Sequence, residues 1–182
     1  FANRYAARIE RGADLFAPVR LPYFPEPAQQ ALAGLKHLVL VETPPPVSFF
    51  GYPGQRSCPA PEDCRFHVLA EEGEDGTAAL EMLAGPALIA RPRIARAALP
   101  AGAPLTAATV GMAIGALLPE GAILSDEMVS SGEPVWAHLA GAPRHDHLPV
   151  TGGSIGQWLP VELGAALACR DRKVIALEAD GS

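Results

Sequence analysis

The residues best able to do chemistry stand at the end of the chain, in the triplet Asp180-Gly181-Ser182. The triplet follows an apolar, β-branched run at 173–177, which predicts a strand buried on both faces. A carboxylate just beyond the carboxyl end of a parallel strand lies where open α/β sheets bind ligands. Mg²⁺ is typically held by one or two carboxylates with substrate phosphates, so Asp180 is a candidate metal ligand. Taken by itself, the triplet is more typical of an ordinary turn.

A glycine turn and a helix precede this strand. Gly152 and Gly153 have no Cβ, so the backbone can approach a ligand closely or adopt a positive φ. Ser154 is predicted to cap a helix that runs to about Cys169, in which apolar residues recur every four positions at Leu159, Leu163 and Leu167. Because Pro160 is tolerated only in a first turn, the regular helix is predicted to start close to it. A helix N-terminus favours the negative charge of a phosphate, so the turn and the carboxylate together predict a Mg²⁺–diphosphate site.

The stretch from Gly152 to Ser182, GGSIGQWLPVELGAALACRDRKVIALEADGS, resembles the start of the diphosphate-binding domain of thiamine-diphosphate (ThDP) enzymes. The resemblance is greatest to the acetolactate synthase large-subunit and benzoylformate decarboxylase branch. That family has a Gly-Gly turn, a helix with the pattern L-P-x-x-x-G-A-x-x-A, and a strand ending in G-D-G-S. This chain departs from the pattern at Ala179, where glycine is usual, and at Trp158, where a small residue is usual.

The resemblance implies a role for each matching residue. Asp180 corresponds to the first Mg²⁺ ligand, and Ile155 to the bulky apolar residue beneath the bent cofactor. The remaining implied cofactor contacts are Ser130, Ser131, Gly153, Ser154, Gly181 and Ser182. The second Mg²⁺ ligand of the family motif, an Asn, is expected beyond Ser182. The activating Glu of the family belongs to an N-terminal domain, so this segment alone is predicted to be inactive.

Two histidines stand in the segment Arg144-His145-Asp146-His147. We interpret this segment as a loop lining the site, with His145 and His147 as candidates for substrate contact or proton transfer. A plain exposed loop is the alternative. His-x-His spacing on a strand would also place two imidazoles on one face, but no distant third residue completes a metal ligand set.

The predicted fold class is α/β, with two parallel-sheet, three-layer α/β/α domains, each incomplete. Residues 1–84 are predicted to form part of a ThDP-enzyme middle domain, 85–104 a proline-rich linker, and 105–182 the N-terminal part of the diphosphate-binding domain. The apolar runs predict strands at 37–41, 65–70 and 122–125 and helices at 26–34, 76–83 and 106–118. The stretch 8–26 resembles a middle-domain segment of an acetolactate-synthase-like subgroup, and its residues indicate a short strand or irregular piece followed by a loop.

Composition and charge limit the classes of partner and the cellular location that the sequence predicts. A net charge of −6 and a pI near 5.3 argue against nucleic acid. The sequence contains no run of 18 apolar residues, so it predicts no membrane span. Residues 1–11 are charged and lack an apolar segment, so we expect no signal peptide. Three cysteines favour reduced thiols in a cytoplasmic protein. The chain starts without Met and stops where a helix should follow, so we expect a fragment of a longer protein.

The function implied by the resemblance is that of a ThDP- and Mg²⁺-dependent acetolactate synthase-like enzyme. Such an enzyme acts on 2-oxo acids by decarboxylation with carboligation, and this chain would supply the diphosphate and Mg²⁺ side. The alternatives are a 2-oxo acid (benzoylformate-type) decarboxylase and a non-catalytic remnant of the family. The implied assembly is a homodimer or homotetramer with the site at a subunit interface.

Overall fold

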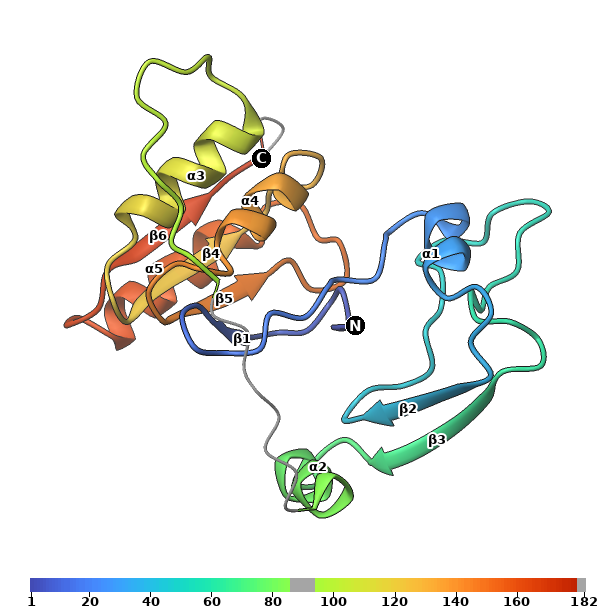
Figure 1. The fold of residues 1–182 in the computed structure, drawn as a ribbon. Coiled ribbons are helices and arrows are strands. Elements are labelled where there is room, and N and C mark those ends of the chain that lie inside the picture. Colours follow the sequence, from blue (N-terminus) through green and yellow to red (C-terminus); the bar gives the residue numbers. More distant parts are fainter. Residues whose placement is uncertain (86–93, 180–182) are drawn as a thin grey trace. The chain divides into compact units, whose positions relative to one another are not determined.

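The computed structural model describes residues 1–85 and 94–179 and divides into two compact units (Figure 1). The first holds residues 1–4 and the described part of 19–89. The second holds residues 5–18 and the described part of 90–182. The chain therefore enters the second unit early, leaves it, and returns. No helix in the described residues is long and apolar enough to cross a membrane.

The first unit contains a parallel pair of strands, β2 (His37–Val41) and β3 (Arg65–Ala70), whose bounds match the sequence prediction. Helix α1 (Pro25–Ala31) begins with a proline, whose fixed φ suits a first turn. Helix α2 (Gly76–Ala84) is capped by Asp75, whose side chain accepts a hydrogen bond of 2.9 Å from the Ala78 amide. A small core, formed by Leu32, Ala60 and Cys64, supports these elements.

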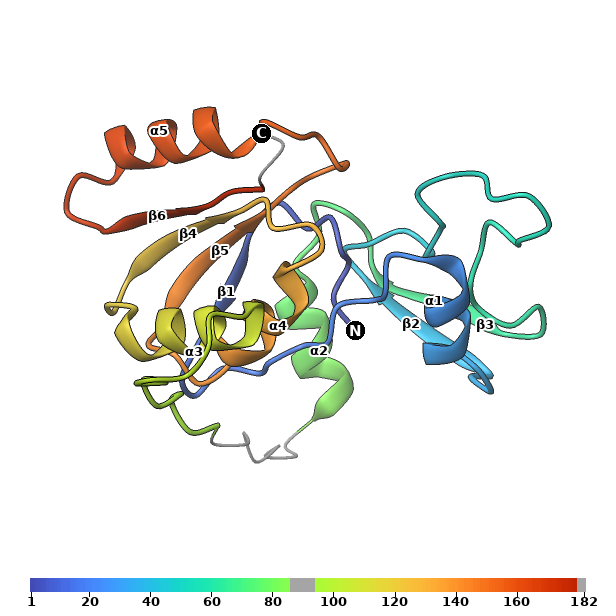
Figure 2. The ribbon, with the colours of Figure 1, turned by 90° about the horizontal axis from the view of Figure 1, so that it is seen from above.

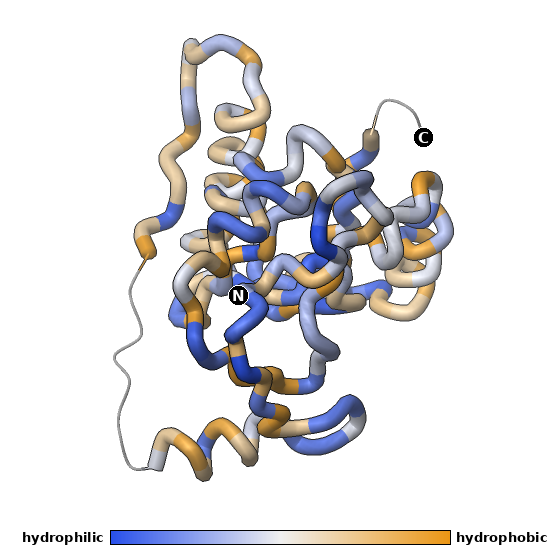
Figure 3. Tube along the Cα trace, turned by 90° about the vertical axis from the view of Figure 1, so that its right-hand side faces the viewer, coloured by the Kyte–Doolittle hydropathy of each residue, from blue (hydrophilic) through white to orange (hydrophobic). Residues whose placement is uncertain are grey.

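Much apolar surface of the first unit reaches solvent. On α2, Leu80, Met82 and Leu83 are 47%, 85% and 65% exposed. Figure 3 shows the apolar positions running through this helix. All three cysteines of the chain, two of them in this unit, are free thiols, as the sequence predicts.

The second unit is built on a sheet that has four strands in the described residues, in the order β1-β5-β4-β6. Strand β4 pairs in parallel with β5 on one side and with β6 on the other. The sheet is mixed rather than wholly parallel, because β1 pairs antiparallel with β5. The strands are β1 (Ile9–Arg11), β4 (Ala122–Asp126), β5 (His145–Pro149) and β6 (Val174–Leu177).

Two helices, α3 (Ala107–Leu117) and α4 (Gly132–His138), pack against one face of this sheet. Their core with β4 comprises Leu118, Ala122, Leu124, Val135, Leu139 and Ala142. Figure 2 shows α5 (Trp158–Ala168) on the opposite side of the sheet. Thr106 caps α3 as predicted, since its hydroxyl accepts a hydrogen bond of 3.1 Å from the Thr109 amide.

The helix before β6 has the predicted start, but its preceding residue differs from the prediction. Helix α5 begins at Trp158, close to Pro160, as predicted, and the residue before it is Gln157, not Ser154. Gly156, between them, has a φ of +89°, which a right-handed helix cannot accommodate. The apolar stripe of α5 is exposed: Leu159, Leu163 and Leu167 are 57%, 59% and 60% exposed. Strand β6 is half-buried rather than buried on both faces, because it lies at the edge of the described sheet.

Candidate functional site

The carboxyl ends of three parallel strands meet at one edge of the second unit's sheet. In the strand register Asp126 lies between Pro149 of β5 and Leu177 of β6. The segments that follow these positions are 127–131, 151–157 and 178–182. Strands β5 and β6 flank β4, and the helices that precede them, α4 and α5, lie on opposite faces (Figure 2). The switch in winding direction therefore lies between β4 and β6, where ligands bind in open α/β sheets.

This edge brings together two of the three segments predicted to hold the cofactor. The third segment carries Asp180, Gly181 and Ser182, which lie outside the described residues, so their predicted roles stay predictions. In the described residues no group of three or more His, Cys, Asp or Glu side chains could hold a metal ion.

Consecutive acidic residues at the end of β4 point to opposite faces of the sheet, because side chains alternate along a strand. Asp126 lies on the α4 side, where its Oδ2 is 2.9 Å from Nε2 of His147. Glu127 lies on the opposite side, next to the start of α5. It is 1% exposed, its Oε1 accepts a hydrogen bond of 2.8 Å from the Gly156 amide, and its Oε2 accepts one of 3.1 Å from the Trp158 amide. Sequence analysis missed Glu127, although its place directly after a buried strand is a usable signal.

The turn at 151–157 is closed at its base and open at its tip. Oε1 of Gln157 accepts hydrogen bonds from the amide and the hydroxyl of Thr151, at 3.0 and 2.8 Å. Between these residues, Gly153, Ser154 and Ile155 are exposed, and Ile155 is 66% exposed. The three residues predicted to meet the cofactor therefore share the exposed tip of one anchored turn.

Ser130 and Ser131 lie between β4 and α4, at the same edge of the sheet. Ser130 is exposed. Ser131 is the residue that precedes α4, and its hydroxyl makes no capping hydrogen bond to that helix. Both hydroxyl groups can donate to phosphate oxygens, so their predicted role is compatible with this position.

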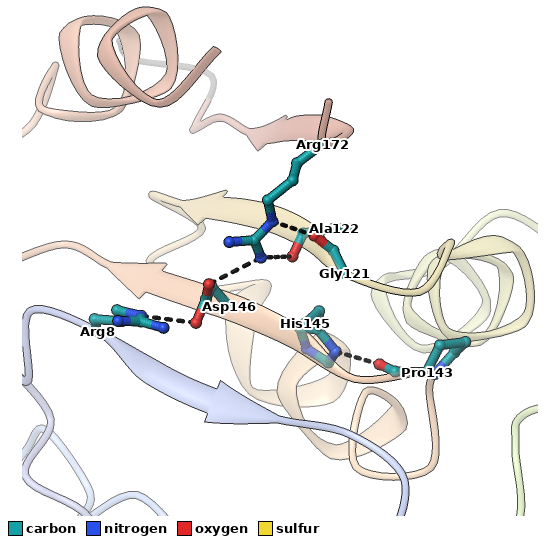
Figure 4. Close-up of polar contacts among 7 residues, drawn as sticks. All are labelled: Arg8, Gly121, Ala122, Pro143, His145, Asp146 and Arg172. Carbon is teal, nitrogen blue, oxygen red and sulfur yellow. Dashed lines mark hydrogen bonds and ion pairs between the residues drawn. The ribbon is translucent and has the colours of Figure 1, made fainter. Parts of the chain in front are cut away.

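His145 and His147 lie in strand β5, not in a loop as the sequence analysis predicted. They are 2% and 0% exposed, on the face that α4 covers. The His147 ring packs edge-on against Trp136, with 5.0 Å between ring centroids. Nδ1 of His145 donates to the Pro143 carbonyl at 2.8 Å (Figure 4). A strand with polar side chains is stable here because these partners lie within the fold, and substrate contact by either histidine stays a prediction.

Charged side chains tie the neighbouring strands of the sheet together. The carboxylate of Asp146 lies between Nε of Arg8 at 2.7 Å and Nη2 of Arg172 at 2.8 Å (Figure 4). Burial opposes ionisation, but the two guanidinium groups hold the pKa of Asp146 below its ordinary value.

Arg11 is buried, with its guanidinium 3.4 Å from the centroid of the Trp136 ring and Nη2 donating to the Trp136 carbonyl.

We expect the stability of the chain to fall as the pH is lowered from 6.5 towards 4. Burial, opposed by the bond to Pro143, lowers the pKa of His145 to about 4, whereas in the unfolded chain it returns to an ordinary value near 6.5. Between these values the unfolded state binds the additional proton. This group therefore leaves the stability unchanged above pH 6.5 and lowers it on acidification towards pH 4, by on the order of 3 kcal/mol.

Urea unfolding between pH 4 and 7 measures this dependence. His145→Gln should flatten the slope in this window. An unchanged slope would show that another group is responsible.

No protein-family model matches the chain. A comparison with curated proteins finds it similar to "Putative acetolactate synthase large subunit IlvX" of Mycobacterium tuberculosis, with 48% identity over 177 residues. The matched residues are 96% of this chain and 34% of that protein. The chain thus spans about a third of the length of the relative it matches.

Proposed function

Since this chain belongs to the family of acetolactate synthase large subunits, we propose that the intact protein is a ThDP- and Mg²⁺-dependent enzyme that acts on 2-oxo acids. The proposed reaction is decarboxylation with carboligation. In this proposal the chain supplies the side of the site that holds the diphosphate and the metal. The observation that supports it is that the carboxyl ends of β4, β5 and β6 lie at one edge of the sheet, at the switch in winding direction.

The chain's residues would bind and orient the cofactor. Asp180 would ligate Mg²⁺ beside Gly181 and Ser182. The hydroxyl groups of Ser130 and Ser131 would donate to the diphosphate. At the tip of the turn, Gly153 and Ser154 would present backbone to the cofactor, and Ile155 would support its bent form. When bound, ThDP stabilises the carbanion left by loss of CO₂, so the protein's task is placement and exclusion of water.

The proposal includes the rest of the site. The activating Glu would come from a different part of the protein, and the complete site would form at a subunit interface in a homodimer or homotetramer. We also propose a cytoplasmic location. The exposed stripe of α5 and the open edge of β6 agree with further polypeptide covering this unit, because apolar surface of this extent is normally buried.

Asp180→Ala in the intact protein tests the metal and cofactor assignment. We expect the variant to lose Mg²⁺-dependent ThDP binding in titration calorimetry, because an apolar side chain cannot replace the carboxylate ligand. Asp171→Ala, which removes an exposed aspartate before β6, is the matched control and should bind as the unmodified protein does. Equal ThDP affinity in Asp180→Ala and the control would contradict the proposal.

A further inference from the structure

The cofactor turn is held by a buried carboxylate from a different strand. Glu127 follows β4 directly and is 1% exposed. Each of its oxygens accepts a hydrogen bond from a different amide, Oε1 from Gly156 and Oε2 from Trp158. One side chain therefore fixes both the end of the turn and the first residue of α5 relative to the sheet.

A carboxylate is costly to bury, and it is retained where its lone pairs are satisfied. Here the acceptors of Glu127 meet two donors at the N-terminal end of α5, where the helix dipole also favours a negative charge. Hydrogen bonds to a charged group are stronger than those between neutral groups. The link between β4 and the turn is therefore much firmer than a neutral loop contact would be.

This link decides where a diphosphate can bind. The Gly156 and Trp158 amides at the start of α5 already donate to Glu127. Because these two amides are occupied, an anion would bind instead at the exposed tip of the turn, which carries Gly153 and Ser154. The turn has three glycines with positive φ, and its internal hydrogen bonds run from the Gln157 side chain to Thr151 and from the Gln157 amide to the Ser154 carbonyl, so its position relative to the sheet depends on its anchors.

We propose that Glu127 is a positioning residue that sets the turn at 151–157 for ThDP binding. The inference rests on the proposed function. It adds a residue that acts through the turn and does not touch the cofactor.

The chemistry of the carboxylate suggests a sharp test. Glu127→Gln keeps the length of the side chain, but its NH₂ group cannot accept from a backbone amide, so one of the two bonds is replaced by opposed donors. Glu120 is the matched control. It also accepts a backbone hydrogen bond, from the Arg144 amide at 3.2 Å, but it is exposed and precedes β4.

The experiment measures the KM for ThDP and the kcat at saturating ThDP for the intact protein, Glu127→Gln and Glu120→Gln. We expect Glu127→Gln to raise the KM for ThDP about tenfold, with kcat at saturation changed less than about twofold. Glu120→Gln should change neither value. Amide hydrogen exchange at Gly156 and Trp158 should be faster in Glu127→Gln even without ThDP.

The outcomes separate this inference from the proposed function. Failure of the unmodified protein to bind ThDP refutes the proposed function, whereas the exchange measurement still tests the link. An unchanged KM for ThDP in folded Glu127→Gln overturns the inference alone. Should that variant not fold, Gln157→Leu loosens the same turn from its partly exposed side, and an unchanged KM for ThDP there would equally overturn it.

Discussion

Replacing His147 with alanine is expected to lower the free energy of unfolding by about 3 to 5 kcal/mol. His147 is fully buried, and its Nε2 lies 2.9 Å from the Asp126 carboxylate. The substitution removes this partner of a buried acid and the ring that packs on Trp136. The variant would remove the imidazole from the Asp126 carboxylate and would leave a cavity beside Trp136. Both changes are costly in an interior that water does not reach.

A double-mutant cycle separates the pair from the packing. Urea unfolding of His147→Ala, Asp126→Ala and the double variant gives their coupling free energy. We expect the double variant to lose at least about 1 kcal/mol less than the sum of the single losses, because the two side chains share one interaction. Additive losses would show that the imidazole stabilises the unit through its volume alone.

The second large effect is expected at the contact between α3 and α4. A Cβ added at Gly111 would lie 2.8 Å from Cα of Val135 and 3.1 Å from the Pro134 carbonyl oxygen. Backbone atoms cannot move aside as a flexible side chain can, so the helices must separate. We expect Gly111→Ala to cost about 3 kcal/mol, at the upper end for overpacking.

Gly164→Ala is the matched control, since it places the same methyl group in the middle of α5. No heavy atom lies within 4 Å of the added Cβ among the described residues. The change should stabilise the chain by about 0.5 to 1 kcal/mol, because alanine is the better helix former. Thermal or urea unfolding measures the stability of both variants. Equal changes in stability for Gly111→Ala and Gly164→Ala would contradict the close packing of α3 on α4.

Elements with strong local signals could be predicted from the sequence. Strands β2 and β3 are uninterrupted runs of strand-forming residues, and both have the predicted bounds. The Thr106 cap of α3 combines a hydroxyl with an apolar run behind it. These signals are local, because a few neighbouring residues determine them.

Elements that depend on distant partners could be predicted only in part. At the start of 8–26 the sequence allows either a short strand or an irregular piece, and the structure has a strand. Strand β1 has the sequence Ile-Glu-Arg, and its arginine is buried because Trp136, from α4, lies beneath the guanidinium. Helix α4 is a seven-residue helix that opens with Gly-Glu-Pro, which gives no apolar period of its own.

In the candidate site, too, local features could be predicted from the sequence, whereas contacts between distant residues could not. The glycine turn and the start of α5 near Pro160 follow from residue type, whereas the residue before the helix is Gln157 and not the predicted cap Ser154. The sequence does not reveal that Glu127, 29 positions before Gly156, holds this turn. Nor does the sequence reveal that His145 and His147 are strand residues, because the Asp126 carboxylate and the Trp136 ring that contact His147 come from other elements of the assembled fold.

The early excursion of the chain into the second unit affects how the protein is made. Arg8 emerges from the ribosome 138 positions before Asp146, the acid to which it binds. At ordinary rates of translation that interval is about ten seconds or more, far longer than a local hairpin needs to form. During synthesis β1 remains without its pairing partner β5 for this interval, so a chaperone that shields the β1 segment would raise the yield of correctly paired protein.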